Sequence, residues 1–201
     1  MSELAVLQAL RLKGRVTLTD LAATLGENPA SIAQAVDALS ASGLLLKGDT
    51  LRLSDHGRAR LSEMLAEERS AADAAALAAA YSQFRPINAD FKALVKDWQL
   101  KEGKPNTHDD IGYDAAILAR LDDVHQRVLP IIAAAAAQLP RLGGYTAKLT
   151  RALDHVKAGR TAWLAHPMID SYHTVWFELH EELILAVGLT REGEASAGHA
   201  Q

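Results

Sequence analysis

The first sixty residues carry apolar positions at a spacing that predicts short helices. Over residues 4–12, 18–25 and 30–41, apolar side chains recur every three or four positions, which is typical of amphipathic helices that bury one face. A glycine follows each of these segments, and glycine commonly ends a helix. Asn28 and Pro29 open the third segment with a capping residue and a proline at the first helical position. The pattern therefore predicts three consecutive helices.

The next segment has the two-residue period of strands. Residues 44–54 read LLLKGDTLRLS, which predicts two short strands over 44–47 and 50–53. The turn between them, Gly48-Asp49, is rich in residues that tolerate a positive φ. Three helices followed by a hairpin is the order of a winged helix-turn-helix module, which we place at residues 1–60.

Several motifs in these segments resemble those of MarR-type winged-helix regulators. The matching features are Leu21-Ala22-x-x-Leu25-Gly26 in the second helix, Ser42-Gly43-Leu44-Leu45 leading into the hairpin, and Leu53-Ser54-x-x-Gly57-Arg58 closing it. The resemblance covers about residues 4–65. It implies that the third helix enters the major groove of DNA and that the hairpin, or wing, contacts the flanking backbone or minor groove.

The third helix differs from that of a strongly basic DNA-binding protein. Affinity for duplex DNA comes largely from Lys and Arg on phosphates, and residues 30–41 contain neither. Base reading would rest on Ser31 and Gln34, because Gln pairs bidentately with adenine and Ser contacts several bases. The candidate DNA contacts are therefore Ser31, Gln34, Lys47, Arg52, Arg15 and Arg58. A helix with no basic residue also leaves open a module that docks proteins instead of DNA.

An alanine-rich segment after Ser54 has strong helix propensity and predicts one long helix, which links the two parts of the chain over 61–85. Pro86 is expected to end this helix, and Asn88 is expected to cap the next one.

Residues 86–190 have helical patterns and no strand candidate, so they predict an all-helical domain for effector binding or oligomerisation. Pro130 is expected to separate two helices, and Pro167 to start the last. Residues 191–201 are small and polar, which predicts a flexible tail. The fold class is mainly α, with a small β-hairpin.

Composition narrows the class of protein. With 49% hydrophobic and 23% charged residues, the chain has the make-up of a soluble globular protein. No stretch approaches the ~20 apolar residues of a membrane span, and no signal-peptide layout is found, so we expect a cytoplasmic protein without a membrane partner. Because cysteine is absent, a metal would need His and carboxylate ligands. A net charge of -4 still allows one local basic surface.

The last helix carries the densest candidate chemistry. His173 and His180 lie at the edge of its apolar face, two turns apart. That separation is too large for one ion without a third element, but it suits one wall of a pocket. Asp122 and His125 fall among the apolar positions of an earlier helix. The candidate ligand-binding residues are His173, His180, Asp122, His125, Asp170, Trp176 and Phe177.

Three interpretations of this cluster stay open. The residues are core groups satisfied by partners, such as a pair between His173 and a carboxylate, or they line a small-molecule effector pocket. In the second case the walls would be Trp98, Trp163, Trp176, Phe177 and Tyr172. The third is a metal site similar to those of some GntR-type regulators. The Asp-x-x-x-His spacing of that family is absent, since Asp122-x-x-His125 is one residue shorter, so no metal ligands are assigned.

An enzyme would need the same groups as acid and base catalysts. No nucleophile elbow, phosphate loop or dinucleotide fingerprint accompanies them, and a helical count places Glu178 and Glu181 on a solvated edge. We therefore expect a homodimeric transcription regulator that binds double-stranded DNA and a small-molecule effector, with no cofactor. A protein-interaction module and an enzyme built on a repurposed winged helix are the alternatives.

Overall fold

The computed structural model describes residues 2–190 and 193–194, so most of the tail predicted for 191–201 lies outside the described residues. The structure is mainly helical, as the sequence predicts, with small antiparallel hairpins. It divides into two compact units, Met1–Ala71 and Ala72–Gln201, called here the N-terminal and C-terminal units. None of the helices over the described residues is long and apolar enough to cross a membrane.

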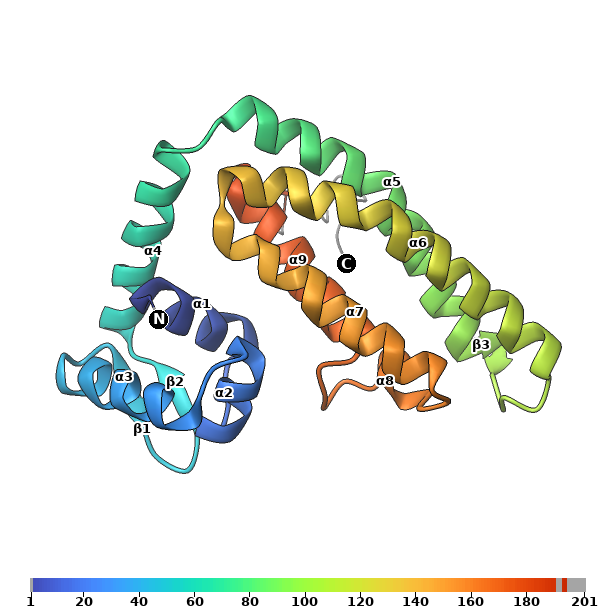
Figure 1. Cartoon of the computed structure of the whole chain (residues 1–201), viewed down its shortest axis with the longest axis horizontal. Coiled ribbons are helices and arrows are strands. Elements are labelled where there is room, and N and C mark those ends of the chain that lie inside the picture. The colour runs from blue at the N-terminus through green and yellow to red at the C-terminus, as the bar shows by residue number, and fades with distance from the viewer. Residues whose placement is uncertain (1, 191–192, 195–201) are drawn as a thin grey trace. The chain divides into compact units, whose positions relative to one another are not determined.

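The N-terminal unit consists of helices α1 (Glu3–Lys13), α2 (Leu18–Leu25) and α3 (Pro29–Ala41), strands β1 (Leu45–Lys47) and β2 (Leu51–Leu53), and helix α4 (Asp55–Ser70) (Figure 1). Hydroxyl or amide side chains begin the helices. Thr17, Asn28 and Ser54 each accept a hydrogen bond from a backbone N–H of the following first turn. These local signals explain why the elements begin at these residues.

The core of the N-terminal unit is aliphatic. Leu7 and Leu10 of α1, Leu21 of α2 and Ile32 of α3 are fully buried. The β1–β2 hairpin pairs antiparallel, and Val16 joins it through two backbone hydrogen bonds with Leu51, a bridge that the sequence pattern does not reveal. The turn after α1 is thereby fixed against the hairpin.

The segment 61–85 is not one helix, contrary to the prediction. Helix α4 ends at Ser70, and α5 (Ala74–Gln99) begins after Asp73, whose carboxylate accepts hydrogen bonds from the backbone N–H groups of Ala75 and Ala76. Asp favours such capping positions because it can satisfy N–H groups that have no helical partner. The capping preference of Asp73 outweighs the helix propensity of the surrounding alanines, and the boundary between the two units falls here.

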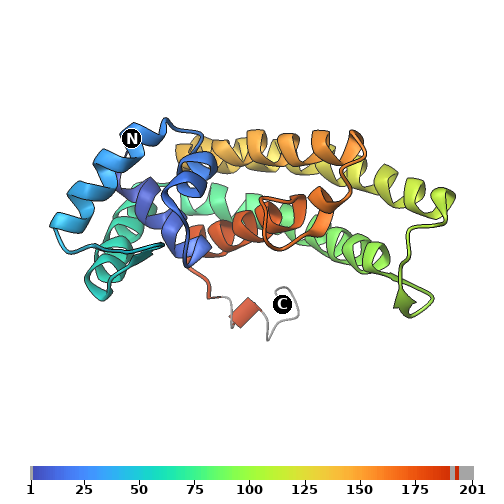
Figure 2. The ribbon, with the colours of Figure 1, turned by 90° about the horizontal axis from the view of Figure 1, so that it is seen from below.

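The C-terminal unit continues from α5 through a two-residue hairpin to a set of packed helices (Figure 1). Its other elements are β3 (Leu100–Lys101), β4 (Lys104–Pro105), α6 (Ile111–Gln138), the 3-10 helix η1 (Pro140–Gly143), α7 (Gly144–Lys157), α8 (Ala162–Ala165) and α9 (Tyr172–Ala186). Figure 2 shows α5, α6, α7 and α9 running lengthwise through this unit. The prediction of no strand in 86–190 is wrong at the β3–β4 hairpin, where Gly103 adopts a positive φ of 77°.

Two prolines that were expected to end helices lie inside them. Pro86 lies within α5 and Pro130 within α6. Both prolines are exposed, while the apolar stripe continues on the buried side, with Phe84 and Ile87 around the first and Val128 around the second. A proline removes one backbone hydrogen bond and bends the helix, but the packing of α5 against α6 keeps the helix intact.

The last helix begins later than predicted. Residues 167–170 form a turn, and α9 starts at Tyr172 after Ser171, whose hydroxyl accepts a hydrogen bond from the backbone N–H of Thr174. The predicted apolar face of α9 is buried, with Tyr172 and Leu179 fully so. Helix α9 packs against α5, α7 and α8, which cover most of its surface.

Candidate functional site

The exposed face of α3 carries the two predicted base-reading residues. Ser31 and Gln34 are exposed, while Ile32, Val36 and Leu39 bury the opposite face. The structure therefore brings Ser31 and Gln34 together on a free surface, one turn apart. The helix itself contributes no basic group to this surface, because residues 29–41 contain no Lys or Arg.

The predicted phosphate contacts differ in how far they are already engaged. Lys47 at the end of β1 forms an ion pair of 2.5 Å with Asp37 of α3, which joins the hairpin to that helix. Arg58 approaches Asp55 at 3.6 Å, a long contact between exposed groups. Among the described residues, Arg15 and Arg52 have no ion pair, and the bridge between Val16 and Leu51 places Arg15 close to the strand that carries Arg52. Arg52 thus lies on the hairpin and Arg15 beside it, and both are exposed.

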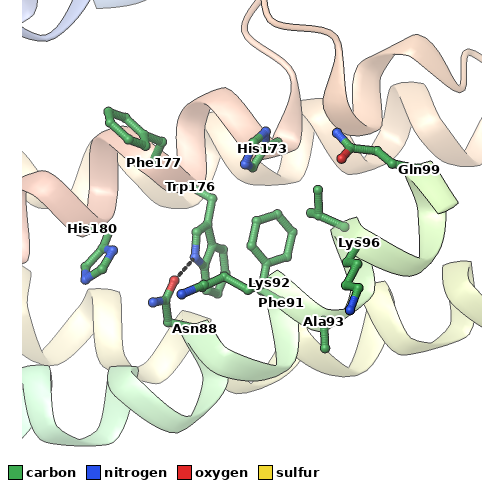
Figure 3. A pocket seen from close by; sticks show the side chains of 11 residues that line it. Asn88, Phe91, Lys92, Ala93, Lys96, Gln99, His173, Trp176, Phe177 and His180 are labelled. Carbon is green, nitrogen blue, oxygen red and sulfur yellow. Dashed lines mark hydrogen bonds between the residues drawn. The ribbon is translucent and has the colours of Figure 1, made fainter. Parts of the chain in front are cut away.

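A pocket of about 460 Å³ lies between α5 and α9 of the C-terminal unit (Figure 3). Its volume falls within the range of about 300–1,000 Å³ of small-molecule sites. The residues that line it are Asn88, Phe91, Lys92, Ala93, Val95, Lys96 and Gln99 from α5, and His173, Trp176, Phe177 and His180 from α9. Four of the seven predicted ligand-binding residues, all of them on α9, are therefore brought together here.

Aromatic rings form the floor of this pocket. The rings of Phe91 and Trp176 are buried and their centroids lie 4.4 Å apart. The indole Nε1 of Trp176 donates a hydrogen bond of 2.9 Å to the Asn88 side-chain oxygen, as Figure 3 shows. This buried bond fixes the indole plane and satisfies its only donor. Trp176 therefore presents an apolar surface to the pocket.

The two histidines of α9 have different surroundings. His180 is buried, with its Nε2 at 3.3 Å from the hydroxyl of Tyr81, and that hydroxyl donates to Glu194 at 2.5 Å. Burial and the hydrogen bond to Glu194 raise the pKa of Tyr81, so the phenol keeps its proton. His173 is half-buried, stands 6.0 Å from the Phe91 ring, and has a pKa lowered by burial. Both histidines line the pocket, and the lowered pKa of His173 favours its neutral form (Figure 3).

Three predicted ligand-binding residues lie away from this pocket. His125 is buried on α6, where its Nδ1 is 3.1 Å from the Tyr172 hydroxyl, and Asp122 forms an ion pair of 2.7 Å with Lys157. Asp170 lies in the turn before α9. The predicted pair between His173 and a carboxylate is absent from the described contacts. Trp98 and Trp163, which were expected to form walls of the pocket, do not line it; their rings lie against those of His108 and His155.

The burial of His125 predicts a pH-dependent stability. Burial first, and then the positive charge of Lys157, lower the pKa of His125 below its ordinary value of 6.5. Below pH 6.5 the unfolded chain takes up a proton that the folded chain resists, so stability is complete above this pH and falls as the pH decreases towards the folded-state pKa, by at most about 1.4 kcal/mol per pH unit.

Replacing His125 by Gln keeps a polar partner for Tyr172 and removes the titration. We expect the decrease in melting temperature between about pH 7 and pH 5 to become shallower in this variant. The same replacement at His56, exposed on α4, serves as the control and should leave the natural profile unchanged. A His125→Gln profile as steep as the natural one would contradict this assignment.

The helical count placed one acidic residue of α9, Glu178, wrongly. Glu178 is 3% exposed and lies 3.8 Å from Lys148 of α7, although it was predicted on a solvated edge, while Glu181 is half-buried. Glu182 is 2% exposed and pairs with Arg141 of η1 at 2.6 Å. The count assumed that only one face of α9 is covered, but α5 and α7 both pack against this helix, so its charged edge is buried as well.

Sequence reasoning missed the α5 wall of the pocket. Asn88 was interpreted as a helix cap after Pro86, although the positions 88, 92, 96 and 99 recur at helical spacing and share one face. Extending the helix through Pro86 would have found this face. Tyr81 gave no signal, because its contacts with His180 and Glu194 are distant in sequence.

Over residues 2–190 and 193–194, no group of three or more His, Asp or Glu side chains is placed to hold a metal ion. His173 and His180 lie two turns apart on α9, and the residues that line the pocket include no Asp or Glu. A scan against protein-family models and searches of curated proteins and of solved structures found no match to this chain.

Proposed function

We propose that this chain is a DNA-binding transcription regulator that acts as a homodimer in the cytoplasm. In this proposal the N-terminal unit is a MarR-like winged helix, with α3 as the recognition helix and β1–β2 as the wing. The pocket between α5 and α9 binds a small-molecule effector. The observation that carries the proposal is the exposed face of α3, where Ser31 and Gln34 have no side-chain partner among the described residues. The neighbouring hairpin carries Arg52 and has Arg15 beside it.

The distribution of charge supports contact with DNA through the arginines around the hairpin. Each neutralised phosphate releases counterions, so even two to four cations give binding that weakens with salt. Arg15 and Arg52 are available for this role, whereas Lys47 would have to exchange Asp37 for a phosphate. One copy therefore offers few phosphate contacts, and a dimer that binds two half-sites doubles them.

Gln34 should determine which sequence is bound. A bidentate contact between Gln and adenine is worth about 1–3 kcal/mol, so Gln34→Ala should weaken specific binding by about ten-fold or more, while binding to unrelated DNA stays the same. Arg52→Gln should weaken binding to both kinds of DNA and lower the slope of log affinity against log salt by about one. Both side chains are exposed, so these replacements should change DNA binding without changing the fold.

The measurement is a gel shift of the full chain on the DNA that flanks its own gene, at several salt concentrations. Gln83→Ala, an exposed glutamine on α5, is the matched control and should bind as the natural chain does. A folded, dimeric protein that forms no specific complex at low salt would overturn the regulator proposal. In that case the partner-free face of α3 would favour a protein-docking module.

A further inference from the structure

We infer that the pocket between α5 and α9 binds a small planar anion, an aromatic ring that carries a carboxylate or phosphate group. The ring would lie against Phe91, Trp176 and Phe177, and the anionic group would lie at Lys92 and Lys96. The inference deepens the effector role and rests on the proposed function for its biological meaning, but the binding itself is tested independently.

The floor and rim of the pocket favour an aromatic ring. The Phe91 and Trp176 rings are rigidly packed, and the Trp176 donor is already used by Asn88. Phe177 is 43% exposed at the rim, an unusual exposure for a phenylalanine, and Figure 3 shows it on the α9 side of the pocket. Flat apolar ligands gain both buried area and offset ring contacts on such surfaces. A long flexible chain would lose more conformational freedom for the same burial.

The charges that line the pocket favour an anion. Lys92 and Lys96 lie one turn apart on the pocket side of α5, and the lining contains no Asp or Glu. Among the described residues, neither lysine amine has an ion pair, in contrast to Lys101, Lys148 and Lys157. Like charges four residues apart on a helix repel each other modestly. One carboxylate or phosphate between them relieves that repulsion and gains a charge-assisted hydrogen bond.

His173 supplies a polar point on the α9 wall of the pocket, whereas the two lysines lie on the α5 wall (Figure 3). Its ring is half-buried, and no hydrogen bond to its nitrogens occurs within the described part of the chain. A half-buried imidazole with this freedom can donate to or accept from a ring substituent such as a hydroxyl group. Together the aromatic floor, the paired lysines and His173 define a ligand with one flat apolar part and one negative end.

The test is titration calorimetry of the full chain with 2-naphthoate and 2-naphthyl phosphate, which distinguish the two anionic groups. The controls are 2-naphthamide, which has the same ring without charge, and acetate and inorganic phosphate, which have the charge without the ring. We expect one of the two naphthyl anions to bind about ten-fold or more tightly than 2-naphthamide. Acetate and inorganic phosphate should give no measurable heat.

Variants assign the effect to the residues. Lys92→Gln combined with Lys96→Gln should abolish the preference for the anion over 2-naphthamide, and Phe177→Ala should weaken both ligands several-fold. Lys104→Gln, an exposed lysine on β4, should change nothing. These side chains are exposed or half-buried, so their variants should melt at the temperature of the natural chain.

Equal affinity for the anion and the amide, or a preference that survives the double lysine variant, would overturn the inference. Binding of the anion without any specific DNA complex would leave the inference standing and remove the regulator proposal. A specific DNA complex without anion binding would overturn the inference and leave the regulator proposal standing.

Discussion

Replacing Arg141 by Met is expected to lower the free energy of unfolding by about 3–5 kcal/mol, because the change leaves the Glu182 carboxylate buried without its cation. Glu182 is 2% exposed, and the Arg141 guanidinium lies 2.6 Å from it with 17% of its side chain exposed. A loss of this size is a large part of the total stability of a typical domain, about 5–15 kcal/mol. The second buried carboxylate of this edge, Glu178, has its own cation, Lys148, at 3.8 Å.

Two further variants separate the loss of a cation from a simple loss of packing. Arg141→Met combined with Glu182→Leu removes both charges and should recover most of the stability, because a buried ion pair replaced by apolar groups is often neutral. Arg127→Met breaks exposed pairs with Asp90 and Asp123 and should cost about 1 kcal/mol or less. Urea unfolding followed by tryptophan fluorescence measures all three, since the three tryptophans lie in the C-terminal unit. A double variant as unstable as Arg141→Met would contradict the account.

Replacing Gly57 by Ala is expected to destabilise the N-terminal unit by about 3 kcal/mol or more. A methyl group on Gly57 would lie only 2.1 Å from the backbone oxygen of Leu44, which itself accepts hydrogen bonds from the backbone and hydroxyl of Ser54. Alanine gains at most about 1 kcal/mol of helix propensity over glycine, so the steric clash outweighs that gain. Relief of the clash requires the start of α4 to move away from the base of the hairpin.

Gly112→Ala is the matched control, because Gly112 lies in the first turn of α6 and its added methyl group would meet only ordinary contacts. It should be neutral or stabilising by up to about 1 kcal/mol. Far-ultraviolet circular dichroism during urea unfolding reports both units, whereas tryptophan fluorescence reports only the C-terminal one. Gly57→Ala should shift a transition seen by circular dichroism to lower urea. Unchanged stability would show that Leu44 and Gly57 are not in close contact.

The elements of the N-terminal unit could be predicted because their signals are local. Asn28 caps α3 in the structure as its position predicts, and Gly26 ends α2 in the left-handed conformation. Such signals depend on a few neighbouring residues. The contact of Val16 with Leu51 could not be predicted in this way, because it depends on how the hairpin folds back.

The C-terminal unit shows where local rules give the wrong boundary. Pro86 and Pro130 were expected to end helices, but packing between α5 and α6 keeps both helices continuous. Conversely, the alanine-rich segment was expected to stay helical, but Asp73 starts a new helix inside it. Local preferences of this kind are worth about 1–3 kcal/mol, which tertiary packing or a well-placed cap can exceed.

The candidate pocket was predicted from one side only. The apolar face of α9 and the positions of His173 and Phe177 on its edge follow from helical periodicity. The opposite wall depends on which helix packs there, and the early end assigned at Pro86 concealed the face that carries Lys92 and Lys96. Asp122 and His125 share polar character with the pocket residues, but they lie between α6 and α7, where Lys157 and Thr150 are their neighbours.

The central claim is that α3 and its hairpin read DNA as part of a dimer, and selection from a random duplex library tests it most directly. Full-length protein is mixed with the library at low salt, bound duplexes are recovered over several rounds, and the enriched sequences are compared with those recovered by Gln34→Ala. The account predicts an inverted repeat whose half-sites are spaced by about ten base pairs or a multiple of it. It also predicts that Gln34→Ala loses the preference at one position in each half-site. Recovery of no enriched sequence, or the same sequence from both proteins, would contradict it.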